Sequence, residues 1–322
     1  MGPFPRSKNM EKFGQRKDAV DIVFQRTMLV FPLLVLLIVG GIFVQLLLSS
    51  WISIKEFGPA FLVTSTWDPV AEKFGALPFI FGTIVSSLVA LLLAVPIGLG
   101  TAIYLAEYAP QWPRRIISSL VDLLAAIPSV IYGLWGIFVL VPVMRSHVQP
   151  FLGKYLGFLP FFQGPAYGIG MFSASVILAI MIIPFIISIS REVILAVPHV
   201  YKEAAYAMGA TRWEAICTII LSYGKAGILG GIILAMGRAI GETMAVTMAI
   251  GNNVKISASL FSPAYTLASV IANEFAEATS KLYLASLTHI GLVLFLVSIV
   301  VNILAWLLLW RINERQKIFQ GR

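Results

Sequence analysis

Two side chains of opposite charge lie within one apolar stretch of this sequence, residues 226–250. Arg238 and Glu242 are four positions apart, so on a continuous helix they share one face. A charge at mid-membrane depth costs at least about 2.5–3.5 kcal/mol, so each needs a partner or water. A guanidinium also suits a tetrahedral oxyanion, to which it donates bidentate hydrogen bonds. We therefore expect Arg238 on the path of an anion, held by Glu242. The alternative is that the two charges only neutralise each other or bridge to a neighbouring helix.

The sequence has no residue pattern that fits metal binding, nucleotide binding or nucleophilic catalysis. The three histidines are isolated, and the one cysteine, Cys217, excludes an intrachain disulfide and a cysteine metal cluster. No glycine-rich loop ends in Gly-Lys-Ser or Gly-Lys-Thr, so ATP binding by a P-loop is not expected. No Ser/His or His/Asp/Glu set recurs at catalytic spacing. We expect no catalytic residue, no metal and no cofactor.

The composition indicates a protein embedded in lipid. Of the 322 residues, 59% are hydrophobic and 12% are charged, and the mean hydropathy is +0.91. Soluble domains carry about 25% charged residues, so much of this apolar surface must face lipid. The formal charge of +8 forms no single patch, which argues against a nucleic-acid partner.

Six apolar segments are long enough to cross a bilayer as helices, since about 17–25 residues suffice. They predict an all-α, polytopic membrane protein with spans at about 27–50, 78–106, 116–144, 171–190, 226–250 and 286–310. The first exceeds a signal-peptide core and lacks a convincing cleavage site, so we expect a retained helix. Pro128 is expected to kink the third span, either as a packing irregularity or around a translocation path.

Lys and Arg counts predict the orientation. With both termini inside, the inside segments hold 16 of these residues and the outside loops hold 6. Cytoplasmic loops carry the excess of positive charge, so the prediction is N-in and C-in. The predicted parts are a cytoplasmic tail (1–26), the first span (27–50), an outside loop (51–77), a five-helix core (78–310) with an inside loop (191–225), and a second tail (311–322).

The inside loop has an ordered helix–glycine–helix pattern. Helix-forming residues over about 199–208 end at Gly209, which suits a C-terminal cap. Thr211 and Glu214 then fit a capping box that opens a second amphipathic segment reaching Leu221. Small alanines beside a carboxylate make a low knob that another protein's groove can accept. The loop contains, in order, Glu203, Ala204, Ala205, Gly209, Ile219 and Leu221.

This spacing resembles the coupling-loop signature of type I ABC importer permeases: Glu-Ala-Ala, three residues, Gly, nine residues, then Ile-x-Leu. The family usually has a proline after the leucine, where this chain has Ser222. The resemblance implies the ABC type I importer permease fold. It also implies that residues 199–222 dock a cytoplasmic ATPase subunit, whose closure on ATP would push on the loop.

Further motifs resemble the phosphate importer permeases of the PstC type over roughly residues 57–310. They are Phe74–Thr83 at the start of the second span, Ile127–Gly136 in the third and Met236–Thr247 in the fifth. The resemblance implies a subunit without catalytic residues of its own. Its partners would be a PstB-type ATPase dimer, a homologous PstA-type permease and an extracytoplasmic PstS-type phosphate-binding protein, in a bacterial or archaeal cytoplasmic membrane.

Other interpretations stay open at this point. A permease for molybdate or sulfate would present a similar arginine, and a self-sufficient secondary transporter would share the hydropathy pattern. Asp122 is expected at the membrane interface. Glu274, Glu277 and Lys281 are expected to form a solvated helical face or to contact a substrate-delivery protein. Cys217 is expected to be a small apolar position.

Overall fold

The computed structural model describes the backbone of residues 8–319 and the side chains of residues 21 and 24–311. The outermost residues of the two predicted tails, 1–7 and 320–322, lie outside it. Nearly all of the described backbone is helical, and only two isolated β-bridges occur within it, Asp68 with Lys73 and Gly251 with Ala264. The all-α prediction is confirmed.

Six helical stretches are long and apolar enough to cross a membrane, as predicted. They are Phe24–Ser49, Leu77–Tyr108, Ser129–Leu156, Met171–Leu195, Arg212–Gly241 and Lys281–Arg311. The chain divides after Ser49 into two compact units. The first unit contains a single helix, α1 (Lys8–Ser49), with Pro32 inside it.

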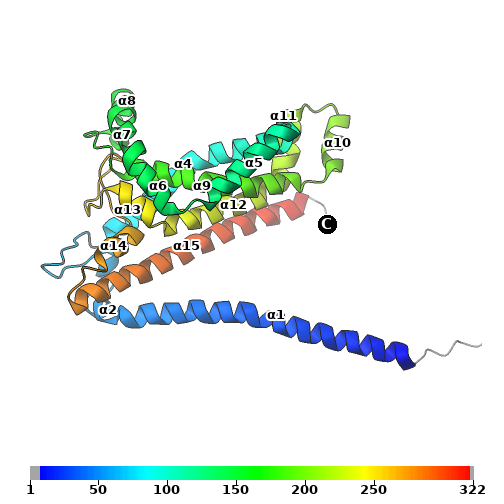
Figure 1. Cartoon of the computed structure of the whole chain (residues 1–322), viewed down its shortest axis with the longest axis horizontal. Helices are drawn as coiled ribbons and strands as arrows, with labels where there is room; N and C mark the ends of the chain where they lie inside the picture. The colour runs from blue at the N-terminus through cyan, green and yellow to red at the C-terminus, as the bar shows by residue number, and fades with distance from the viewer. Residues whose placement is uncertain (1–7, 320–322) are drawn as a thin grey trace, which may run out of the picture. The chain divides into compact units, whose positions relative to one another are not determined.

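The second unit holds every other element (Figure 1). In chain order these are α2 (Trp51–Phe57), α3 (Ala60–Val63), α4 (Leu77–Ile103), the π-helical turn η1 (Tyr104–Tyr108), α5 (Gln111–Ala126), α6 (Ser129–Trp135), η2 (Gly136–Leu140), α7 (Val141–Val143), η3 (Met144–Val148), α8 (Gln149–Leu156), η4 (Pro160–Phe162), α9 (Met171–Leu195), α10 (His199–Ala207), α11 (Arg212–Ala215), η5 (Ile216–Ile220), α12 (Leu221–Gly241), α13 (Met244–Ile250), α14 (Leu267–Glu274) and α15 (Lys281–Phe319).

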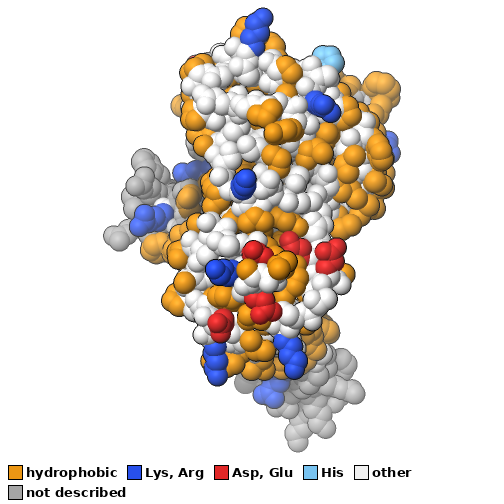
Figure 2. All heavy atoms as spheres, turned by 90° about the vertical axis from the view of Figure 1, so that its left-hand side faces the viewer, with side chains coloured by type: hydrophobic (Ala, Val, Ile, Leu, Met, Phe, Trp, Pro, Cys, Tyr) orange, Lys and Arg blue, Asp and Glu red, His pale blue; other side chains and the backbone are white. Residues whose placement is uncertain are grey.

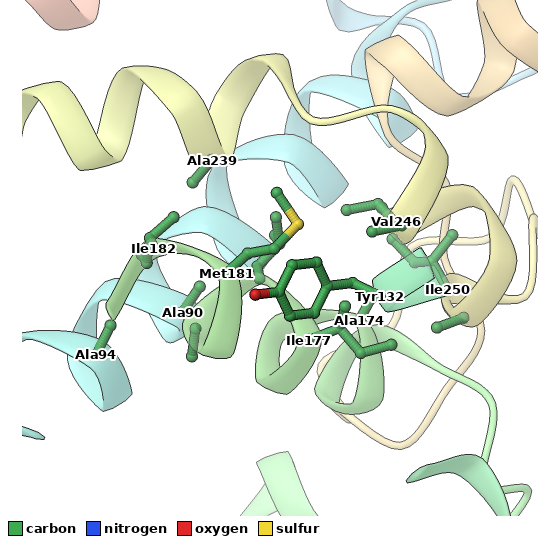
Figure 3. Packing of buried hydrophobic residues seen from close by; sticks show 14 of the residues in the cluster. Ala90, Ala94, Tyr132, Ala174, Ile177, Met181, Ile182, Ala239, Val246 and Ile250 are labelled. Carbon is green, nitrogen blue, oxygen red and sulfur yellow. The ribbon is translucent and has the colours of Figure 1, made fainter. Parts of the chain in front are cut away.

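Helix α9 forms the centre of the second unit and packs most extensively along α4. Small residues let the backbones approach: Ala90 and Ala94 are fully buried, and a Cβ at Gly98 would stand 2.8 Å from Ile186 Cγ2. Close approach through small residues is the usual way that helices associate in lipid, where the hydrophobic effect gives little attraction. Figure 3 shows the resulting core, with α6, α12 and α13 completing it around Ile177 and Ile182.

Helix α12 carries two strips of small residues: one packs against α9, and the other has open space beside it. A Cβ at Gly227 or Gly231 would stand 2.7 Å from Val193 or Ile189 of α9, so these glycines allow α12 to lie against α9. Gly237 and Gly241 have open space where a Cβ would stand. Helix α12 therefore has a second face that the described part of the chain does not cover there.

Two predicted spans are interrupted, so the prediction that each is a single helix was wrong. Residues 116–144 are divided by an extended segment at Ile127 and Pro128, since proline has no N–H to continue the ladder. Residues 226–250 are divided after Gly241: Glu242 is extended, and the chain becomes helical again at Met244. Polar side chains around the second break bond the local backbone and so compete with helical hydrogen bonds.

The two ends of the second unit differ. One end, here the α10 end, carries α10 and α11, and the C-terminal part of α15 runs toward it (Figure 1). The opposite end, here the α14 end, carries α2, α3 and α14. The predicted outside loop 51–77 belongs to it and contains two short helices, α2 and α3. Its aromatic core consists of Phe61, Trp67, Phe74, Phe79, Tyr265 and Tyr283.

Candidate substrate pathway and coupling surface

The predicted helix–glycine–helix hairpin is present at the α10 end. Helix α10 ends at Ala207, and Gly209 has φ +87°, which glycine adopts without strain. Thr211 Oγ1 accepts the backbone N–H of Glu214, and Glu214 Oε2 accepts the N–H of Thr211, at 3.3 and 2.8 Å. This is the capping box that the sequence predicts. After α11 the helix continues through η5 into α12 without a break. Ser222, at the position where the importer family usually has a proline, lies inside this continuous helix.

Helix α10 presents the residues of the predicted coupling motif in two directions. Glu203 and Ala204 are exposed, whereas Ala205 is buried. Large apolar side chains around them are also exposed: Val200 by 71%, Met208 by 85% and Trp213 by 61%. Such a patch is typical of a protein-interaction surface. We call it the coupling surface.

The second half of the motif fixes this hairpin to the helical core. Ile216 and Ile220 are buried in one cluster with Ile194, in the last turn of α9, and with Val197, which follows that helix. Ile219 and Leu221 are partly buried on either side of Ile220. The apolar spacing and Ala205 therefore anchor the hairpin, while Glu203 and Ala204 face outward.

A buried ion pair joins α10 to another helix. Lys202 Nζ lies 2.5 Å from Glu107 Oε1, and the two side chains are only 10% and 12% exposed. Glu107 belongs to η1, the turn that ends α4. Nothing in the sequence pattern predicts this pair, because the two residues are 95 positions apart.

The structure separates the predicted pair Arg238 and Glu242. Arg238 is exposed near the end of α12, and its guanidinium lies 4.4 Å from the ring centroid of Phe185 on α9. Glu242 follows the end of α12 and accepts the N–H of Ala245 at 3.3 Å. The expectation that they share one helix face was wrong, because the helix ends between them. A cation–π contact takes the place of the expected carboxylate partner of Arg238.

The two helix breaks lie side by side in this unit. A Cβ at Gly133 of α6 would stand 3.2 Å from Ala245 Cα of α13, so the helices that follow the breaks are in close contact. Two discontinuous helices thus meet within this unit, and transporters often build substrate sites from such helices.

Tyr132 stabilises the first break, and the sequence analysis missed its role. Its hydroxyl donates to the carbonyl oxygen of Leu124 at 2.8 Å. In a continuous helix that carbonyl would accept the N–H of residue 128, which is a proline. The signal in the sequence was Pro128 itself, which cannot donate the usual helical hydrogen bond to that carbonyl; the N–H of Ile127 donates to it instead, at 3.3 Å. Leu124 and Tyr132 also line an apolar pocket of about 310 Å³ with Ile127, Ile131, Trp135 and Ile180.

The remaining predicted charges have defined positions. Asp122 on α5 is exposed and accepts a hydrogen bond from Ser188 of α9 at 3.1 Å. Glu277 and Lys281 are exposed. Glu274 does not belong to a solvated face, because its Oε2 accepts both the Trp67 indole N–H and the Tyr283 hydroxyl at 2.7 Å. That part of the prediction was wrong: Glu274 links α14 to the 51–77 segment and α15.

The α14 end has a mixed charged surface (Figure 2). Acidic side chains gather over one part of it, with lysines around them. The exposed charges that these elements carry are Lys55, Glu56, Asp68, Glu72, Lys73, Lys255, Glu277 and Lys281. Beneath this surface burial raises the pKa of Tyr265 to about 12, so its hydroxyl stays neutral and accepts the amide of Asn273.

Buried histidine serves packing at this end. His289 of α15 lies 3.0 Å from Ser53 Oγ of α2 through Nδ1, and its ring stacks on Phe61 at 3.9 Å. Within the part of the chain that the structure describes, no three His, Cys, Asp or Glu side chains form a metal-binding group. Cys217 is exposed, in η5 of the hairpin.

The fold of this chain is that of a chain in a solved ABC importer. The crystal structure of a bacterial ABC transporter that imports alginate contains a chain with a TM-score of 0.58 to this one. The match covers 94% of this chain and 99% of that chain at 17% identity, which shows a common fold.

The family follows from the sequence comparisons. Residues 94–314 match the family described as binding-protein-dependent transport system inner membrane component, and the chain belongs to this family. A phosphate transport system permease protein PstC from Mesorhizobium japonicum is 47% identical, covering 94% of this chain and 93% of that protein. The PstC protein of Pasteurella multocida is 46% identical, covering 92% and 94%. The resemblance to PstC-type permeases is confirmed.

Proposed function

We propose that this chain is a permease subunit of an ATP-driven importer of inorganic phosphate. The observation that carries the proposal is the coupling surface, an exposed apolar and acidic patch on an otherwise well-anchored hairpin. Such a patch needs a partner, and the family places this chain in a binding-protein-dependent transport system. The relatives that share nearly its whole length are phosphate transport permeases.

The coupling surface docks a PstB-type ATPase dimer in the cytoplasm. Glu203, Ala204 and the exposed side chains of Val200, Met208 and Trp213 enter a groove of the ATPase subunit. ATP-driven closure of the dimer then moves α10 and opens the path through the membrane. This assignment places the α10 end and both termini inside, as the Lys and Arg distribution indicates. The α14 end, with its charged surface, receives a PstS-type phosphate-binding protein outside.

Phosphate passes beside Arg238, between this chain and a PstA-type permease. The uncovered face of α12 supports this arrangement, since Arg238 lies on it together with Leu234, which is 67% exposed, and the open side of Gly237. A second helix bundle packed against α12 would enclose Arg238. Glu242 and the discontinuous helices near it supply polar backbone to the same path.

Purification of the tagged chain from native membranes tests the assembly. We expect an ATPase, a second permease and a phosphate-binding protein to be recovered with it. Proteoliposomes of the complex then test the substrate: phosphate uptake should require ATP inside and should not be suppressed by excess molybdate or sulfate. Uptake by the chain alone, driven by an ion gradient, would instead indicate a secondary transporter. Suppression by molybdate or sulfate would indicate another oxyanion.

A further inference from the structure

The ion pair between Lys202 and Glu107 is the most enclosed charged contact in the part of the chain whose side chains are described. Its side chains are 10% and 12% exposed, with the charged atoms 2.5 Å apart. The second ion pair there, Arg191 with Glu192, joins sequence neighbours and leaves Glu192 67% exposed. A buried pair adds little net stability, but removing one partner leaves an uncompensated buried charge, so the two groups must stay together.

On one side the pair belongs to the coupling surface. Lys202 immediately precedes Glu203 and Ala204, both exposed. The chain leaves α10 through the turn at Gly209 on one side and enters it through Val197 and Pro198 on the other. Any movement of the exposed face of α10 therefore also moves Lys202, which is the residue next to Glu203.

On the other side the pair belongs to the helix that runs along the centre of the bundle. Glu107 lies in η1, which continues α4 directly. The adjacent carbonyl of Ala106 accepts a hydrogen bond from Arg114 Nη2 at 2.8 Å, which holds the backbone beside Glu107. Helix α4 in turn packs along α9, whose Phe185 contacts Arg238.

We propose that the Lys202–Glu107 pair transmits movement of the coupling helix to α4 and so to the substrate path. Both are positioning residues for transport. Helix α10 is covalently continuous with α9 and α12 but not with α4, so this pair supplies a direct charged link to α4. The inference rests on the proposed function, in which an ATPase subunit moves α10.

Charge exchange in the complete importer tests this inference. Lys202→Glu and Glu107→Lys each place like charges together, and the double variant restores opposite charges in reversed order. The measured quantity is the amount of phosphate transported per ATP hydrolysed in proteoliposomes. ATP is enclosed in the vesicles, and the phosphate-loaded binding protein is added outside. This ratio does not change when some of the protein is simply unfolded. Copurification of the ATPase subunit is measured in parallel.

We expect each single variant to lower the ratio by about tenfold, the order of a typical coupling interaction, while the ATPase subunit still copurifies. The double variant should recover most of the ratio. Lys202→Arg, which keeps the charge, should also transport well, and Lys202→Met should not. Glu192→Gln, which removes the partner from the exposed pair, is the control and should leave the ratio unchanged.

Three results would overturn the inference. They are a normal ratio in the single variants, a double variant that assembles but stays uncoupled, and loss of the ATPase subunit from the single variants. The last would mean that the pair only holds the docking surface in shape. Failure of the proposed function looks different, because the unaltered chain would then recover no ATPase and show no ATP-dependent phosphate uptake.

Discussion

The coupling hairpin at 199–222 and the paired breaks at 127–132 and 241–245 are both interruptions of helices, yet they are stabilised differently. In the hairpin, Gly209 and Thr211 satisfy the helix ends within a few residues. At the first membrane break, the carbonyl of Leu124 accepts the N–H of Ile127 and also the hydroxyl of Tyr132, which belongs to the next helix. In a membrane, a neighbouring element can supply the hydrogen bond that water would otherwise provide. The hairpin therefore suits an exposed docking surface and the breaks suit an enclosed path.

The largest effect is expected from Arg238→Ala. It removes the cation that we place beside the anion path, so phosphate uptake should fall to background while the ATPase and the second permease are still recovered. Radiolabelled phosphate uptake in cells lacking the native chain measures this. Arg145→Ala, which removes an exposed cation from η3, is the matched control. Normal uptake by Arg238→Ala would remove the assignment of the path.

A substitution at Gly209 should affect the other region. Valine at φ +87° costs about 1–2 kcal/mol and distorts the end of α10, so recovery of the ATPase subunit should fall severalfold. Gly58→Val strains the chain at φ +52° at the α14 end, where a Cβ meets nothing within 4 Å. That control should keep the ATPase bound. Equal losses of the ATPase subunit in both variants would show that backbone strain at either end disrupts assembly. The two ends would then not differ in this respect.

Tyr132→Phe tests whether the first break depends on its distant donor. The variant leaves the Leu124 carbonyl with only the longer hydrogen bond from the Ile127 N–H, at 3.3 Å, and a lost intramolecular hydrogen bond costs about 0.5–1.5 kcal/mol. We expect a lower thermal midpoint of the purified complex and a severalfold slower uptake, with the ATPase still recovered. Tyr155→Phe, at an exposed tyrosine of α8, should change neither. An unchanged midpoint in Tyr132→Phe would mean that the hydrogen bond from the Ile127 N–H is enough for this break.

The smallest effect is expected from Thr211→Ala, which removes the capping box at the start of α11. Loss of such a cap costs about 0.5–2 kcal/mol. Amide hydrogen exchange should become faster at 212–216 and stay unchanged at 244–248. Faster exchange at both places would indicate that the two regions unfold together, contrary to the difference described above.

What the sequence determined by itself was the part of the protein governed by nearby residues. Six apolar stretches, the ends of α10 and α11, and the helix–glycine–helix hairpin were all predictable, because bilayer thickness and local capping depend on composition and short spacing. Membership of the family followed from the same motifs.

Only the tertiary structure decided where the charges find partners. It ended α12 between Arg238 and Glu242, placed Arg238 on Phe185, and joined Lys202 to Glu107 across 95 positions. It also turned Glu274 into a shared acceptor for Trp67 and Tyr283. A buried charge takes whichever partner the packed helices bring within reach, and spacing along one helix does not reveal that partner.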